Sequence, residues 1–212
     1  MSASVIFDLD GTLWDATGEV YRLWNAVFAE RPETAGVKLK QSDMFAFMGR
    51  TIYEIGEMLF PDMEPELRRE IMRECSGREN DHLREHGARL YGGLAETLEL
   101  LKSERDLYIV SNCQKGYIEA FLHAHRLEAF FRDSESSGRT GKSKGENIRL
   151  LMERNGETDA VYVGDTVMDE RAAGYAGIPF VFAAYGFGKA EAPAAVIGEI
   201  SELPRALASL GK

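Results

Sequence analysis

Residues 5–13 read VIFDLDGTL, and this stretch decides the fold. Its first three residues are apolar and predict a short buried strand, because strands of a parallel sheet are covered on both faces. Asp8 and Asp10 follow at the end of that strand, before a Gly-Thr turn. Ligands of α/β sheets bind at the carboxyl ends of the strands. Two crowded carboxylates repel each other unless a cation lies between them or one holds a proton, so the pair suggests catalysis or metal binding.

The segment that follows the first strand is helical. Apolar residues at positions 20, 23, 24, 27 and 28 lie on one helical face, and helical patterns recur as far as residue 86. No convincing strand interrupts them. We therefore expect a core formed by residues 1–15 and 88–212, interrupted by a helical cap of residues 16–87.

Beyond residue 88, strand and helix patterns alternate. Further strands are expected at residues 107–110, from residue 130 onward, at 160–163 and at 179–183, and helices at 94–103, 117–125, 145–155, 169–176 and 201–210. Such alternation predicts an α/β fold, with a parallel sheet and helices on both faces. The polar run 133–137 is interpreted as a solvated face.

Composition excludes some partner classes. The 212 residues are 44% hydrophobic and 28% charged, and the formal net charge is −10. This charge argues against nucleic acid or an anionic membrane as a main partner, since both select basic surfaces. No apolar run approaches the roughly 20 residues of a membrane span, and we see no signal peptide. Cys75 and Cys113 are therefore expected to be reduced thiols in a cytoplasmic protein.

Polar residues also follow two other predicted strands. Ser111 and Asn112 end one of them, and Asp165 ends another, with Asp169 four residues later. In a parallel sheet these side chains gather at the edge that holds Asp8. A site rich in carboxylates suits Mg²⁺, and a nearby lysine and hydroxyl suit a phosphate.

Four motifs, in their order along the chain, resemble those of the haloacid dehalogenase superfamily of phosphotransferases. They are the stretch of residues 8–12, Ser111-Asn112, Lys144, and the stretch of residues 164–169. The helical insert is similar to the cap of the subfamily that contains phosphoglycolate phosphatase and β-phosphoglucomutase. The resemblance covers the whole core and implies a Rossmann-like sheet with an inserted α-helical cap.

The resemblance also implies catalytic roles. Asp8 would be the nucleophile that forms an aspartyl-phosphate, and Asp10 would protonate the leaving alcohol and later deprotonate water. Mg²⁺ would be held by the Asp8 carboxylate, the Asp10 backbone carbonyl and the Asp165 carboxylate.

Other residues would bind the phosphoryl group. Ser111, Asn112 and Lys144 are implied as phosphate ligands, and Gly11 and Thr12 as sources of turn geometry and backbone N–H groups. Taken alone, Ser111 is more often a turn residue.

Two choices near the site stay open. Lys144 matches the family lysine better than Lys142, although Gly145 stands where the family often has proline. Asp169 is implied as an outer residue that orients metal-bound water or Lys144.

Arg50 and Trp14 carry weaker signals. Arg50 lies at a cap loop where relatives often place a substrate contact, and it is equally well explained as an exposed arginine near a helix start. Trp14 either lines the cleft between cap and core or packs in the interior.

Together these residues predict a magnesium-dependent phosphatase that hydrolyses a small phosphorylated metabolite, with a monomer as the default assembly. A phosphosugar mutase shares the same core residues. A dehalogenase needs neither Asp10 nor the metal carboxylates, and a non-catalytic phosphometabolite-binding protein needs no complete catalytic set. Phosphoglycolate, a sugar phosphate and a nucleotide monophosphate all stay open as substrates.

Overall fold

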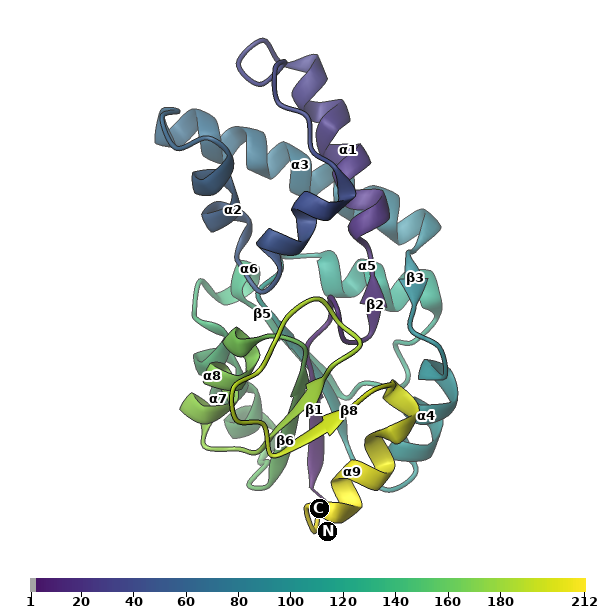
Figure 1. The fold of residues 1–212 in the computed structure, drawn as a ribbon. Coiled ribbons are helices and arrows are strands. Elements are labelled where there is room, and N and C mark those ends of the chain that lie inside the picture. The colour runs from purple at the N-terminus through teal and green to yellow at the C-terminus, as the bar shows by residue number, and fades with distance from the viewer. Residues whose placement is uncertain (1–2) are drawn as a thin grey trace.

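A six-stranded sheet forms the centre of the molecule (Figure 1). The computed structural model describes residues 3–212. The strands are β1 (Ser4–Phe7), β4 (Leu107–Ser111), β5 (Asp133–Ser136), β6 (Ala160–Gly164), β7 (Phe180–Ala183) and β8 (Ala195–Ile197). Their order is β5-β4-β1-β6-β7-β8, and each neighbouring pair is parallel. The carboxyl ends of β4, β1 and β6 therefore meet at the middle of one edge.

Each face of the sheet is covered by helices. Side chains alternate along a strand, so Val5 and Phe7 belong to one hydrophobic cluster and Ile6 to the other. The first cluster includes residues of α4 (Leu94–Lys102), α5 (Tyr117–His125) and α9 (Leu203–Ser209). The second includes residues of α7 (Lys144–Asn155) and α8 (Val167–Ala176). The predicted α/β core with helices on both faces is confirmed.

A helical insertion between β1 and β4 forms a cap at the end of the molecule opposite the termini (Figure 1). It contains α1 (Thr17–Glu30), the 3₁₀-helix η1 (Gln41–Phe47), α2 (Ile52–Leu59) and α3 (Pro65–His86). The buried faces of α1 and α3 join the same hydrophobic cluster as one face of the sheet. The predicted cap is therefore present, while its division from the core at residues 15/16 and 87/88 stays a prediction.

The two chain segments that connect core and cap lie side by side. Strands β2 (Trp14–Asp15) and β3 (Arg89–Leu90) pair in an antiparallel ribbon. The Arg89 guanidinium donates to Asp15 Oδ2 over 2.8 Å, which adds an ion pair across it. The chain thus passes from core to cap and back through this one two-stranded ribbon.

The sequence interpretation is wrong around residues 130–137. Phe130 and Phe131 precede the strand, and β5 is the polar run that we expected to be a solvated face. This strand is at the edge of the sheet, where Arg154 donates hydrogen bonds to Asp133 and Glu135. Polar residues can form this strand because Arg154 of α7 pairs with their charges, so the sequence lacks the apolar pattern of a buried strand.

Four further short elements were not expected: α6 (Ser137–Thr140), the strands β2 and β3, and the edge strand β8. The helix expected at residues 201–210 is divided into η2 (Ile200–Glu202) and α9. A strand of three residues is too short to show an alternation that separates it from a loop.

Among the helices of residues 3–212, none has the length and hydrophobicity that a bilayer span requires. Both cysteines are free thiols: Cys75 is buried in the cap, and Cys113 is half-buried beside the loop that follows β4.

Candidate active site

Three strand ends bring the predicted polar residues together. Asp8 follows β1, Ser111 ends β4, and Asp165 follows β6. Because β1 lies between β4 and β6, Asp8 is central and the other two flank it. Asp8 and Asp165 are 3% and 0% exposed, so carboxylates from distant parts of the chain converge in a region shielded from water.

A buried lysine joins two of the carboxylates. Lys144 is the first residue of α7, whose start is fixed by a capping box between Ser143 and Glu146. Its Nζ donates to Asp8 Oδ1 over 2.9 Å and to Asp169 Oδ1 over 2.6 Å. Lys142 is exposed. Lys144, and not Lys142, therefore makes the contact with Asp8.

Charge pairing keeps Lys144 protonated. Burial alone would lower the pKa of Lys144, but the carboxylates of Asp169 and Asp8 outweigh it and hold that pKa well above its usual range. Burial raises the pKa of Asp8 to about 6, with the Lys144 charge acting in the opposite direction. An added cation would hold Asp8 in the ionised form that a nucleophile needs.

Asp169 both pairs with Lys144 and caps a helix. Its second oxygen accepts hydrogen bonds from the Thr166 backbone N–H at 2.9 Å and from the Thr166 hydroxyl, which together cap α8. Its first oxygen accepts from Lys144. Both oxygens are thus occupied, and Asp169 holds Lys144 in place.

Asp165, by contrast, keeps an unpartnered oxygen. Its Oδ2 accepts from the Phe187 backbone N–H over 2.7 Å, while its buried Oδ1 has no hydrogen-bond partner among the described residues. A Cβ atom at Gly11 or Gly186 would lie 2.2 or 2.3 Å from Asp165 atoms, so only glycine fits on either side. Burial, and then the charges of Asp169 and Asp8, raise the pKa of Asp165 well above its usual range.

These carboxylates fit a metal ion. One oxygen each of Asp8, Asp165 and Asp169 lies within 4.8 Å of the other two. An orphaned buried oxygen is costly unless a ligand pairs with it, and a donor set made only of oxygens suits a hard divalent cation. The cluster is a candidate metal site, in which Asp165 keeps a buried unpartnered oxygen and both oxygens of Asp169 accept hydrogen bonds.

Asp10 is held by two aromatic donors on one oxygen. The indole Nε1 of Trp14 and the hydroxyl of Tyr117 both donate to Asp10 Oδ1, over 2.9 and 2.8 Å. Oδ2 is left for another partner. Burial raises the pKa of Asp10 to about 7, against the effect of the Tyr117 hydrogen bond. A carboxyl group with such a pKa can carry a proton near neutrality. Trp14, left open by the sequence, is both buried and in contact with Asp10.

The other predicted phosphate ligands are engaged with protein groups. Asn112 donates from Nδ2 to the Gly49 carbonyl over 2.7 Å and accepts from the Ser137 hydroxyl. The Gly11 N–H donates to the Trp14 carbonyl, and the Thr12 N–H donates to the Leu9 carbonyl. Their phosphate-binding roles stay a prediction.

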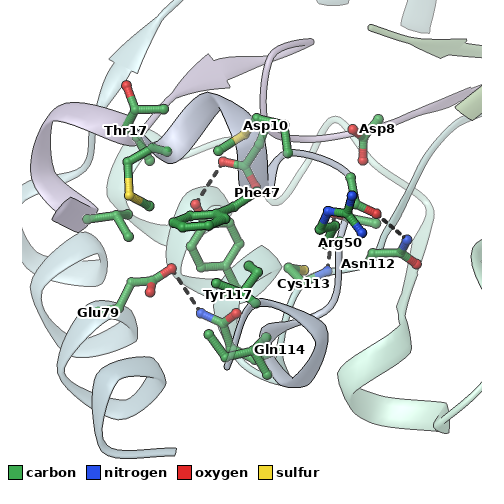
Figure 2. Close-up of a pocket in the computed structure, with 18 of the residues that line it drawn as sticks. Asp8, Asp10, Thr17, Phe47, Arg50, Glu79, Asn112, Cys113, Gln114 and Tyr117 are labelled. Atoms are coloured by element: carbon green, nitrogen blue, oxygen red, sulfur yellow. Dashed lines mark hydrogen bonds between the residues drawn. The ribbon is translucent and has the colours of Figure 1, made fainter. Parts of the chain in front are cut away.

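A pocket lies between the site and the cap (Figure 2). Asp8, Asp10, Ser111 and Lys144 line it from the core, and Arg50 lines it from the loop before α2. The cap side is mostly apolar, formed by Val20, Trp24, Met44, Phe47, Met48, Ile52 and Ile55. The space open to the centre of a water-sized sphere is about 70 Å³, which suits a compact ligand.

Sequence reasoning missed several residues at the site. Tyr117 carried no motif, and Glu79 stood in a long polar helix with no sign that it faces a pocket. Phe187 was not singled out in the sequence, yet its N–H donates to Asp165 Oδ2 and its ring stacks on that of Phe45 in the cap, with ring centroids 5.4 Å apart. Only the flanking glycines, Gly186 and Gly188, hinted at a close backbone approach.

Comparisons with known proteins find similar sequences and folds. The family model for haloacid dehalogenase-like hydrolases matches residues 5–183. The phosphoglycolate phosphatase of Synechococcus elongatus is 30% identical over 190 residues, which cover 87% of this chain and 84% of that protein.

Solved structures share the fold along the whole chain. A predicted phosphatase from Clostridium acetobutylicum has a TM-score of 0.80 at 21% identity and covers 99% of both chains. A putative phosphoglycolate phosphatase from Lactobacillus plantarum has a TM-score of 0.82 at 19% identity, covering 97% of this chain and 100% of that one. At these identities the likeness establishes the capped fold.

Proposed function

The chain belongs to the haloacid dehalogenase-like hydrolases, in the capped subfamily similar to phosphoglycolate phosphatase, and from that premise we propose a magnesium-dependent phosphatase of small phosphomonoesters. The observation that carries the proposal is the convergence of Asp8, Lys144 and Asp165 beside an oriented Asp10. The prediction of a phosphatase of this family is confirmed, and the details below are our proposal.

Asp8 is the nucleophile. Its Oδ1 accepts a hydrogen bond from Lys144, which leaves Oδ2 as the oxygen that attacks phosphorus. The attack forms an Asp8–phosphorus bond while the bond from phosphorus to the leaving oxygen breaks. Water then attacks the phosphorylated Asp8, which releases inorganic phosphate and restores the carboxylate.

Asp10 moves the protons. In its neutral form it donates a proton to the leaving oxygen, so that an alcohol departs rather than an alkoxide. As a carboxylate it then accepts a proton from the attacking water. Trp14 and Tyr117 fix one oxygen by hydrogen bonds and thereby aim the other at the reacting atoms.

Asp8, Asp165 and the Asp10 backbone carbonyl would hold Mg²⁺. The unpartnered Asp165 Oδ1 and the all-oxygen donor set fit this ion. When bound, the ion supplies positive charge that offsets repulsion between Asp8 and the phosphate dianion. Asp169 would contribute indirectly, by fixing Lys144.

The phosphoryl oxygens would bind Lys144 and Ser111. Lys144 provides a fixed positive charge, and Ser111, which is buried, lines the pocket with a hydroxyl group to donate. Apolar cap residues exclude water from the rest of the pocket, which strengthens these interactions.

The test uses the purified protein, Mg²⁺ and a panel of phosphorylated metabolites that includes phosphoglycolate, the compound in the name of the Synechococcus elongatus relative. Release of inorganic phosphate supports the proposal. Isomerised sugar phosphate without free phosphate would identify a mutase instead. Binding without any turnover, of an aryl phosphate as well, would indicate a non-catalytic protein.

A further inference from the structure

The pocket has a second polar end, away from the nucleophile. Figure 2 shows Glu79 and Gln114 on the opposite side of the pocket from Asp8, with Asp10 and Tyr117 between them. With Asp10 at the leaving oxygen, as in the proposed function, the pocket offers the rest of the leaving alcohol a path toward Glu79. Glu79 therefore faces the part of the substrate that differs from one phosphomonoester to another.

Glu79 is a buried acid without a cationic partner. It lies on α3 and is 4% exposed. Its oxygens accept from two neutral donors, the Trp24 indole at 2.7 Å and the Gln114 amide at 3.0 Å. The ion pairs among residues 3–212 include none with Glu79. Each carboxylate oxygen has two lone pairs, so acceptor capacity is left on both.

The other walls at this end offer no compensating positive charge. Val20, Phe47, Ile52 and Ile55 are apolar. Arg50, the cap cation that lines the pocket, is drawn in Figure 2 beside Asn112, on the far side of Tyr117 from Glu79. A carboxylate on the leaving alcohol would thus meet a buried carboxyl group in apolar surroundings, at a high electrostatic cost.

We propose that Glu79 selects phosphate esters of short alcohols that carry a terminal hydrogen-bond donor, an amine or a hydroxyl, and rejects those that carry a carboxylate. This inference rests on the proposed phosphatase function and names its substrate class. A donor fills the free acceptor capacity of Glu79, whereas phosphoglycolate places a second acid against it. The narrow cavity favours chains of about two or three atoms beyond the leaving oxygen.

Burial supports the same selectivity. It raises the pKa of Glu79 to about 7, against the hydrogen bonds from Gln114 and Trp24. A bound ammonium group would hold the carboxylate ionised, while a bound carboxylate would force Glu79 to take up a proton.

The experiment compares four matched esters: 2-aminoethyl, 2-hydroxyethyl, n-propyl and carboxymethyl phosphate, the last being phosphoglycolate. Steady-state kcat and KM are measured with Mg²⁺ for the wild type, Glu79→Gln and Glu85→Gln. Glu85 is the matched control, because it lies on the same helix with its side chain 77% exposed. Calorimetric binding to the Asp8→Asn variant measures the same preference without turnover.

We expect the wild type to favour the amine or hydroxyl ester over the carboxymethyl ester by at least about tenfold in kcat/KM, mostly through KM. Glu79→Gln should shrink this ratio to about threefold or less, and Glu85→Gln should keep it. A higher kcat/KM for the 2-aminoethyl ester would show that charge dominates the preference, and a higher value for the 2-hydroxyethyl ester would show that hydrogen bonding does.

Equal binding and kcat/KM for the amine and carboxymethyl esters in the wild type would overturn the proposal, whether or not the variant folds. An unchanged ratio in a folded Glu79→Gln variant would overturn it too, since a purely structural role leaves the ratio alone. Absence of turnover with every ester and with an aryl phosphate would instead refute the phosphatase function, while the calorimetry still tests the selectivity.

Discussion

The two ends of the pocket differ in how their charges are paired. At the core end, Asp8 and Asp169 share the buried Lys144, and Asp165 keeps one oxygen free. At the cap end, Glu79 meets only neutral donors. The difference teaches that buried charge is paired at the core end and unpaired at the cap end; in the proposed function, the core end holds the phosphoryl group and the cap end faces the group attached to it.

The largest expected effect comes from the core end. Asp8→Asn removes the attacking carboxylate but keeps its size, so kcat with an aryl phosphate should fall by about ten-thousand-fold or more. Thermal unfolding should show a folded protein. A variant that keeps a tenth of the wild-type rate would contradict the role of Asp8.

Removal of the metal should abolish catalysis at the core end reversibly. With excess chelator, turnover should fall by roughly a thousandfold, because Lys144 alone would then offset the repulsion between Asp8 and the phosphate. Added Mg²⁺ should restore the rate in the wild type. Asp165→Asn should need far more Mg²⁺ for the same recovery. Full activity in chelator would remove the metal from the account.

Asp10 lies between the two ends, and its pH dependence sharpens the comparison. Because burial raises its pKa to about 7, kcat/KM for alkyl phosphates should fall as pH rises through that value and the proton is lost. Tyr117→Phe removes a hydrogen bond that lowers this pKa, so the fall should move to higher pH. The variant should also lose roughly tenfold in kcat through poorer aim of Asp10. A pH profile identical to that of the wild type would show that Tyr117 does not act on Asp10.

The smallest effect is expected where cap and core touch outside the pocket. Phe45 of η1 stacks on Phe187, whose backbone binds Asp165. Phe45→Ala should raise KM about threefold to tenfold, since such a pair is worth about 0.5–1.5 kcal/mol. Tyr53→Ala is the control, because Tyr53 is equally exposed, at 49%, on the same cap. Equal effects of both variants would mean that the stack has no part in holding the cap.

The core end could be predicted from sequence because its residues follow strands, and parallel strands share an edge. The stretch at residues 5–13 and the polar residues after β4 and β6 are local signals of this kind. The strand β5 was missed because its polar residues are paired by Arg154 instead of packed.

The cap end could not be predicted in the same way. Glu79 and Gln114 are brought together by packing of α3 against α5 and its preceding loop, over 35 residues of sequence, and no local pattern encodes that contact. The hydrogen bond from Tyr117 to Asp10 joins residues 107 positions apart, and no local pattern predicts it either. Local motifs thus predict the residues of the core end, whereas the contacts at the cap end depend on long-range packing.

The most direct test of the central claim, that Asp8 takes the phosphoryl group from substrate, uses the Asp10→Asn variant with an activated aryl phosphate. Such a leaving group needs no acid, but hydrolysis of the phosphorylated enzyme still needs the base, so the intermediate should accumulate. We predict a burst of about one aryl alcohol per enzyme. Mass spectrometry after an acid quench should find one added PO₃ unit on Asp8. Turnover without a burst or adduct, or an adduct on another residue, would contradict the account.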